Sequence, residues 1–173
     1  MSPRTAPDRP ALESPEVRVL VGCWEIWQAL AGAGDEALRT AHGLNLREFI
    51  ALSHVQGSGD GVCSPAELAA ALGVPRYEVS RTLGRLEALG AVRRTRTGGT
   101  DARQVRVELT PHGAQLWEAA LGTVQALVRP VLAPLGDALP GLGNALHAAA
   151  RLARQLTPGS TPPPNPLTQG HPP

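Results

Sequence analysis

The segment SPAELAAALGVPRYEVSRTLGRLEALGAVRRTRTGGTDARQVRVEL, residues 64–109, carries the strongest structural signal in the chain. Its first half predicts a helix from Ser64 to Leu72 and a second from Arg76 to Leu89, joined by a tight Gly73-Val74-Pro75 turn. Its last residues, Gln104 to Leu109, alternate polar and apolar side chains, which is typical of a half-buried strand.

A second strand is expected just before this one, from Ala91 to Arg96. Thr97-Gly98-Gly99-Thr100 lies between the two strands and supplies the glycines that a hairpin tip needs for positive φ. Two helices followed by a two-stranded hairpin form a helix-turn-helix with a wing. In that fold the second helix, from Arg76 to Leu89, enters the major groove of DNA.

The charge of the chain is concentrated in the same segment. The 173 residues have a formal net charge of only +1, and all 16 basic residues are arginine. Residues 76–106 hold eight arginines and three acids, a net of +5, whereas the other residues hold eight arginines and twelve acids, a net of −4. Neutralising DNA phosphates requires such a local cluster. The eight arginines are Arg76, Arg81, Arg85, Arg93, Arg94, Arg96, Arg103 and Arg106.

The second helix separates its side chains into two faces at about 100° per residue. One face is apolar and is expected in the core: Val79, Thr82, Leu83 and Leu86. The opposite face combines two arginines and a tyrosine with two very small residues: Tyr77, Arg81, Gly84, Arg85 and Ala88. Small residues beside arginines suit close approach to a groove, although arginines that only solubilise a surface helix are the alternative.

Further helices are marked by their capping residues. Ser14 precedes Pro15, and both Asn45 with Glu48 and Ser64 with Glu67 fit the capping box. Thr110 before Pro111 and Asp137 predict the starts of two more helices, with Pro130 and Pro134 expected to kink or end the first of these. The predicted order is four helices, a hairpin and two helices.

The C-terminal helices are expected to bury against a second copy of the chain. Only three formal charges, Glu118, Arg129 and Asp137, occur from residue 114 to residue 150. A surface helix of a monomer needs a polar half, but apolar residues here cover more than one face. They are Leu116, Trp117, Leu121, Val124, Leu127, Val128, Val131, Leu132 and Leu135.

The remaining composition bounds the class of protein. Hydrophobic residues make up 42% of the chain, which is enough for a core, and two cysteines exclude a disulfide-rich secreted scaffold. Residues 1–13 and the proline-rich residues 157–173 are expected to be disordered tails. Neither a signal peptide nor an apolar run of about 18 residues is expected, so the predicted location is the cytoplasm.

Several motifs in this frame resemble the MarR family of bacterial transcription regulators. They are residues 79–92 (VSRTLGRLEALGAV), Arg94, residues 101–113 (DARQVRVELTPHG) and Gly43-Leu44-Asn45-Leu46. The D-x-R and L-T-x-x-G motifs are the most specific, and the similarity covers roughly residues 15–156. Gly84 departs from the family, which often has a larger residue there, and the wing is short. The resemblance implies a homodimeric winged-helix regulator, usually a repressor, released by a small aromatic ligand or by thiol oxidation.

The fold class expected is therefore mainly α with a small β-hairpin wing. The winged helix would span about residues 44–110, and dimerisation helices would span about 14–42 and 111–156. By resemblance, Arg103 enters the minor groove and Asp101 orients it, while Ser80 and Arg81 are placed to reach base edges in the major groove. The full set of predicted DNA-binding residues is Arg76, Tyr77, Ser80, Arg81, Arg85, Arg94, Thr95, Arg96, Asp101 and Arg103.

Other sites are weaker. Trp24, Trp27 and Phe49 are candidates to line an effector pocket, with plain core packing as the alternative. Cys23 is expected to be a buried structural cysteine and Cys63 a loop residue; redox sensing through Cys23 is an alternative, as is a winged helix that contacts proteins rather than DNA. No metal-ligand spacing and no catalytic arrangement is present in the sequence, so neither a cofactor nor an enzyme activity is expected.

Overall fold

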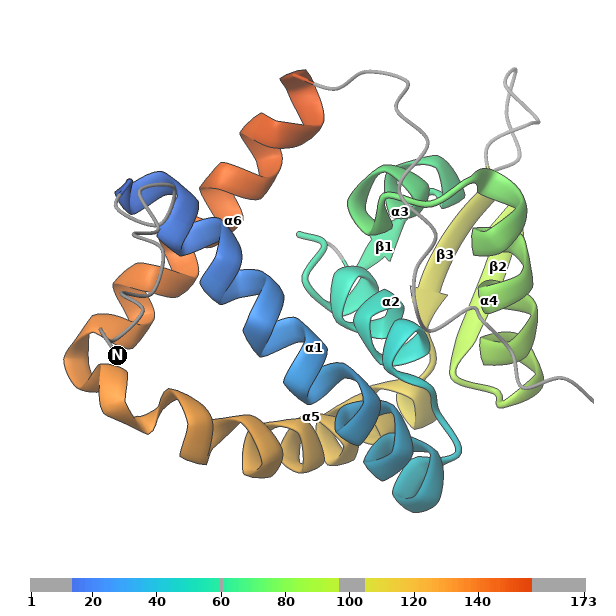
Figure 1. Cartoon of the computed structure of the whole chain (residues 1–173). Helices are drawn as coiled ribbons and strands as arrows, with labels where there is room; N and C mark the ends of the chain where they lie inside the picture. The colour runs from blue at the N-terminus through green and yellow to red at the C-terminus, as the bar shows by residue number, and fades with distance from the viewer. Residues whose placement is uncertain (1–13, 60, 97–104, 157–173) are drawn as a thin grey trace, which may run out of the picture.

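The computed structural model describes residues 14–59, 61–96 and 105–156, and its elements are shown in Figure 1. The described chain is mainly helical with one small antiparallel sheet, which confirms the predicted fold class. The elements are α1 (Pro15–His42), α2 (Leu46–Gln56), β1 (Val62–Cys63), α3 (Pro65–Leu72), α4 (Arg76–Ala88), β2 (Val92–Arg96), β3 (Val105–Leu109), α5 (Pro111–Leu132), a 3-10 segment η2 (Ala133–Ala138) and α6 (Leu139–Leu156).

The capping residues set most of the helix starts. The side chains of Asn45 and Ser64 accept hydrogen bonds from the backbone N–H groups of Glu48 and Glu67, and both glutamates reach back to complete the predicted capping boxes. Thr110 caps α5 by accepting from the N–H of Gly113 at 2.9 Å. These local contacts satisfy backbone donors that a helix start leaves unpaired.

The sheet contains one strand more than the predicted hairpin. β2 and β3 pair antiparallel with Val92 opposite Leu109 and Arg96 opposite Val105, which confirms the two strands of the wing. β1 pairs with the other edge of β3, with Cys63 opposite Val107, so the strand order is β1-β3-β2. The hairpin tip expected at Thr97–Thr100 lies outside the described residues.

The core lies between α2, α3, α4 and the sheet, and the C-terminal part of α1 closes it from one side (Figure 1). Its fully buried side chains are mostly leucine and valine, which excludes water from the winged helix. The largest are Leu38, Leu44, Leu52, Leu68, Leu83, Leu86, Val55, Val79 and Val107.

The C-terminal helices form two arms on the side away from the sheet (Figure 1). α5 continues through Pro130 to Leu132, so Pro130 does not itself end the helix. The chain bends at Gly136, whose φ of 48° and ψ of −128° are non-helical, two residues after Pro134. The prediction that Asp137 caps the last helix is wrong, because Asp137 lies inside η2 and α6 begins two residues later, at Leu139.

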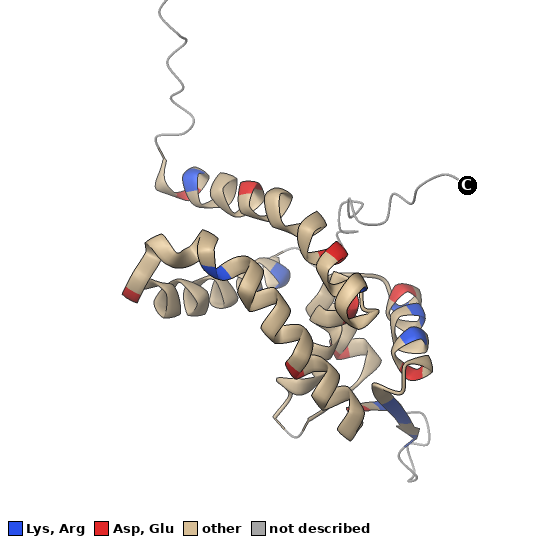
Figure 2. Ribbon diagram, turned by 90° about the horizontal axis from the view of Figure 1, so that it is seen from below, with Lys and Arg blue, Asp and Glu red and all other residues tan. Residues whose placement is uncertain are grey.

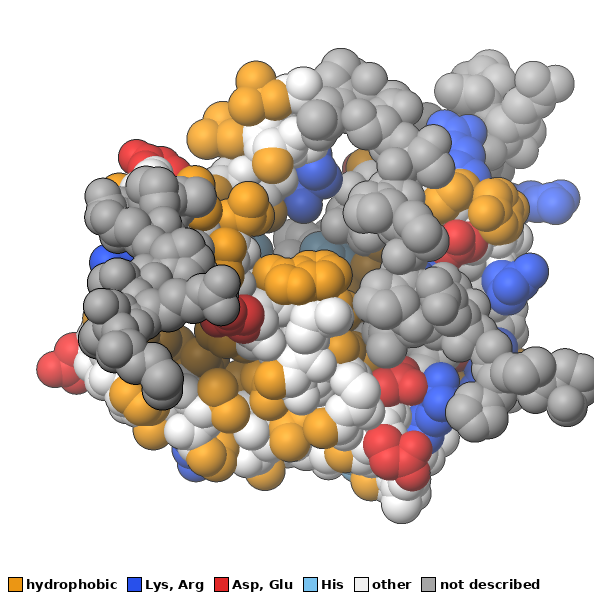
Figure 3. All heavy atoms as spheres, viewed as in Figure 1, with side chains coloured by type: hydrophobic (Ala, Val, Ile, Leu, Met, Phe, Trp, Pro, Cys, Tyr) orange, Lys and Arg blue, Asp and Glu red, His pale blue; other side chains and the backbone are white. Residues whose placement is uncertain are grey.

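The arms and the N-terminal half of α1 expose many apolar side chains, which gather on the left of Figure 3. By length and composition alone, one 18-residue window within Pro111–Leu156 is apolar enough to cross a membrane, although charged residues interrupt the stretch, so no unbroken apolar run of that length occurs in it. The same composition suits helices that bury against another copy of the chain. The exposed large side chains are Val17, Val19, Leu20, Trp24, Ile26, Val131, Leu135, Leu139, Leu142, Leu146, Leu152 and Leu156.

Candidate nucleic-acid interface

Helix α4 presents the two faces that its sequence predicts. Val79, Thr82, Leu83 and Leu86 are buried against the core. Tyr77, Arg81, Arg85 and Ala88 are exposed and Gly84 is half-buried on the opposite side. Because the apolar face fixes the helix on the domain, the outward face is a rigid platform for basic side chains.

The predicted DNA-binding residues that the structure describes lie on this platform and on the adjacent strand β2. Figure 2 shows arginines along α4 and β2 at one end of the molecule. All are exposed except Thr95, which is half-buried. Asp101 and Arg103 lie outside the described residues. The described members are Arg76, Tyr77, Ser80, Arg81, Arg85, Arg94, Thr95 and Arg96.

Ion pairs divide these arginines into two groups. Nε of Arg85 donates to Oε1 of Glu48 at 2.6 Å, and Arg94 pairs with Glu87. The hydrogen bond from Arg94 lowers the pKa of the Glu87 carboxyl, and the same bond raises the pKa of Arg94. Arg76, Arg81 and Arg96 have no ion pair within the described part of the chain, so their full charge is available to phosphates.

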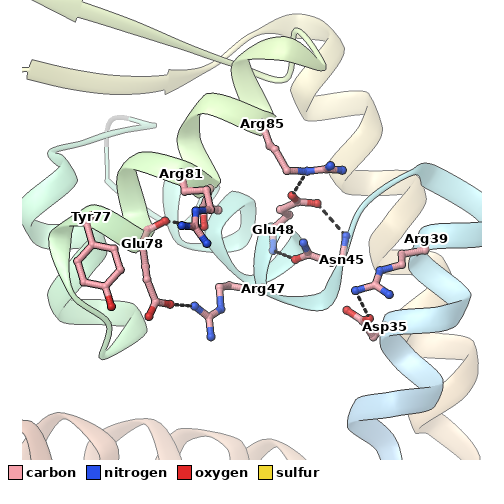
Figure 4. Close-up of a pocket in the computed structure, with 10 residues that line it drawn as sticks. Asp35, Arg39, Asn45, Arg47, Glu48, Tyr77, Glu78, Arg81 and Arg85 are labelled. Carbon is pink, nitrogen blue, oxygen red and sulfur yellow. Dashed lines mark hydrogen bonds and ion pairs between the residues drawn. The ribbon is translucent and has the colours of Figure 1, made fainter. Parts of the chain in front are cut away.

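A pocket of about 400 Å³ lies beside the outward face of α4, against the corner where α1 meets α2 (Figure 4). Arginines and carboxylates alternate around it, and ion pairs join α2 to α4 across it. Its lining residues are Asp35, Arg39, Asn45, Arg47, Glu48, Tyr77, Glu78, Arg81, Thr82 and Arg85.

Sequence reasoning missed the acidic half of this site. Arg47 pairs with Glu78 in the first turn of α4, and Glu48, seen from sequence only as part of a capping box, also holds Arg85. Asp35 accepts from the N–H of Leu46 at 2.9 Å and pairs with Arg39 at 2.8 Å. The capping-box spacing and the four-residue spacing of Asp35 and Arg39 are the sequence signals for this half. The pairs that join α2 to α4 have no such signal, because their residues lie more than thirty positions apart in the chain.

The predicted effector-pocket residues differ in their exposure. Phe49 is 7% exposed within the core, whereas Trp24 is 56% exposed on α1. Trp27 packs partly buried against the core. None of the three lines the pocket beside α4, and their role in binding an effector stays a prediction.

Both cysteines differ from their predictions. Cys23 is exposed and Cys63 is buried. The prediction of a buried Cys23 is wrong for this single protomer, because the N-terminal half of α1 extends beyond the core. Cys63 is a strand residue rather than a loop residue, since β1 pairs it with Val107.

Sequence comparison matches the central part of the chain to a known protein family. Residues 42–104, which contain α2, α3, α4 and the start of the wing, match the family model described as the MarR family. The winged helix belongs to the MarR family. No curated protein is significantly similar to the chain in sequence.

Solved structures with the same fold cover nearly the whole MarR-type domain. The transcriptional regulator BldR from Sulfolobus solfataricus has a TM-score of 0.69 and 23% identity, and the match covers 83% of this chain and 99% of BldR. The M. tuberculosis regulator MOSR, solved in complex with DNA, has a TM-score of 0.59 and 28% identity, covering 79% and 96%. NadR, solved with 4-hydroxyphenylacetate, has a TM-score of 0.65 and 20% identity, covering 86% and 98%. BldR and MOSR are transcriptional regulators, which agrees with the expected absence of an enzyme activity.

Proposed function

We propose that this chain is a sequence-specific, double-stranded DNA-binding transcription regulator of the cytoplasm, acting as a repressor. The observation that carries the proposal is the outward face of α4, where Arg76 and Arg81 are exposed and free of ion pairs within the described residues. An arginine on a helix of this fold reads guanine or contacts phosphate in the major groove. MOSR, a protein of the same fold, was solved in complex with DNA, which supports DNA binding by this chain.

We further propose that a small aromatic effector binds the repressor and releases it from DNA. NadR, which has the same fold, was solved with 4-hydroxyphenylacetate. The arginine-lined pocket beside α4 offers charge to an aromatic acid, and ligand binding there would compete with DNA for Arg81. Titration of a panel of aromatic acids into the protein–DNA complex tests this.

The DNA-binding assignment is tested by a mobility-shift titration on random duplex over a salt series. A DNA-binding winged helix with several phosphate contacts loses affinity steeply as salt rises. A winged helix that serves only protein contacts would show no salt-dependent binding, and that result would support the alternative class of function.

We predict a homodimer at micromolar concentration. The exposed apolar side chains of α1 and of the α5–α6 arms exceed what a monomer leaves in water, and burying them in a second copy removes that cost. The two α4 helices would then read half-sites about one helical turn apart in a pseudo-palindrome. Sedimentation equilibrium measures the mass, and a monomer at tens of micromolar would contradict the prediction.

We predict that Cys23→Ser leaves DNA affinity and its response to peroxide unchanged. Cys23 is accessible in the protomer, but a sensor also needs a stabilised thiolate. The nearest charge in sequence is the acid Glu25, so no adjacent arginine supplies that stabilisation. DNA affinity of wild type and variant is measured before and after hydrogen peroxide. Release of the wild type alone would establish redox sensing through Cys23.

A further inference from the structure

We infer that Glu48 is a positioning residue for DNA reading, acting through Arg85. This inference rests on the proposed function. Arg85 belongs to the outward face of α4, yet its orientation is set by a carboxylate from a different helix. Figure 4 shows Glu48 on α2 directly beneath Arg85, with Asn45 on its other side.

The carboxylate of Glu48 is held on both oxygens. Oε1 accepts from Nε of Arg85 at 2.6 Å, and Oε2 accepts from the N–H of Asn45 at 2.8 Å. The side chain of Glu48 is 2% exposed, whereas that of Arg85 is 60% exposed. Because this carboxylate is buried and both of its oxygens accept hydrogen bonds, its position is fixed. It therefore fixes the Nε of Arg85, while the rest of the guanidinium stays exposed.

The choice of Nε as the donor to Glu48 matters, because a guanidinium has two further nitrogens that can donate hydrogen bonds. Glu48 accepts its hydrogen bond from Nε, and neither terminal Nη group of Arg85 donates a hydrogen bond within the described residues. Those two nitrogens are the pair that guanine or a phosphate binds in a bidentate contact. A fixed Nε reduces the rotamer freedom that Arg85 would lose on binding, which favours one geometry over others.

A second ion pair reinforces the same arrangement. Arg47, the neighbour of Glu48, pairs with Glu78 in the first turn of α4. Consecutive residues of α2 therefore hold α4 at two points, one near its start and one about two turns later. The opposite polarity of the two pairs fixes the register of α4 on α2.

The effect of Glu48→Gln separates positioning from charge. Removing an acid near DNA strengthens binding to every duplex, because repulsion of phosphates is lost. Removing a positioning residue instead weakens binding to the preferred sequence relative to other sequences. Glutamine also fits the third position of a capping box, so the start of α2 is retained.

The experiment measures affinity for a duplex selected from a random pool by the wild-type protein and for a scrambled duplex. For Glu48→Gln we expect the ratio of the two affinities to fall about tenfold, the size of one lost base contact. Glu108→Gln is the matched control, because it removes an equal charge from an exposed pair with Arg93 on the wing. It should change both affinities alike and leave the ratio unchanged.

A coupling measurement distinguishes this role from a merely structural one. In the Arg85→Ala background Glu48→Gln should no longer change the affinity ratio, since the residue that it positions is absent. The Nε–H signal of Arg85 in a nitrogen–proton NMR spectrum, assigned by its loss in Arg85→Ala, should be protected from exchange in the wild type and lost in Glu48→Gln.

An unchanged ratio in a folded Glu48→Gln variant would overturn the inference, as would an equal fall of the ratio in the presence and absence of Arg85. Failure of the wild type to bind any duplex is a different outcome, because it overturns the proposed function itself.

Discussion

Gly113→Ala is expected to lower the free energy of unfolding by about 3 kcal/mol or more, because the new methyl group has no room. A Cβ at this position would lie 1.8 Å from the carbonyl oxygen of Ala91 and 2.7 Å from its carbonyl carbon. Both are backbone atoms, so no side chain can rotate away. The first turn of α5 would have to separate from the turn that precedes β2.

The surrounding hydrogen bonds oppose that separation. The oxygen of Ala91 accepts from the N–H of Thr110 at 3.1 Å, and the hydroxyl of Thr110 donates to the oxygen of Gly90 at 2.6 Å. The same hydroxyl accepts from the N–H of Gly113. Moving α5 outward therefore breaks contacts that join the wing to the C-terminal arms.

Gly122→Ala is the matched control on the same helix. Nothing lies within 4 Å of a Cβ at Gly122, which is exposed, so alanine should stabilise the helix by about 0.5–1 kcal/mol. Urea unfolding at one fixed protein concentration measures both variants, since a dimer makes stability depend on concentration. Equal stability of Gly113→Ala and wild type would contradict the close approach of α5 to Ala91.

The helix starts could be predicted from the sequence because their causes are local. Asn45 with Glu48 and Ser64 with Glu67 lie three residues apart, and each pair forms the expected capping box. β1 was missed because two residues are too few to show alternation, and its partner β3 lies more than forty positions away in sequence. Local spacing carries no information about such pairing.

The same limit applies to the site. The sequence identified the outward face of α4 from its period, but it could not show that Glu48 pairs with Arg85 while Arg81 stays free of described ion pairs. It also marked L-T-x-x-G only as a family motif; the structure supplies its physical reason in the approach of Gly113 to Ala91. Cys23 was predicted to be buried but is exposed, because the sequence of a helix does not show which part of it the core covers.

Arg81→Ala is expected to weaken binding to the preferred duplex by about 1–3 kcal/mol and to relax preference at one or two base pairs. Arg81 is exposed near the start of α4, and no carboxylate among the described residues competes for it. Both its charge and its hydrogen-bond donors are therefore available in the major groove. The salt slope should fall by about one unit if the lost charge also neutralised a phosphate.

Arg103→Ala should act differently, because the resemblance to the MarR family assigns that residue to the minor groove. A minor-groove arginine reads the narrow shape of A·T-rich DNA rather than individual base edges. Its loss should weaken binding and reduce discrimination for A·T-rich flanks, with little change in preference under α4. Titrations on selected, scrambled and flank-substituted duplexes across a salt series separate the two effects.

Arg18→Ala is the control for charge alone, since Arg18 is exposed at the start of α1, away from the winged helix. It removes the same charge as Arg81→Ala but no contact in a groove, so affinity for every duplex should change by about twofold at most. If Arg81→Ala and Arg103→Ala had effects as small and as uniform as Arg18→Ala, these arginines would be ordinary surface charges. The outward face of α4 would then not be the surface that reads DNA.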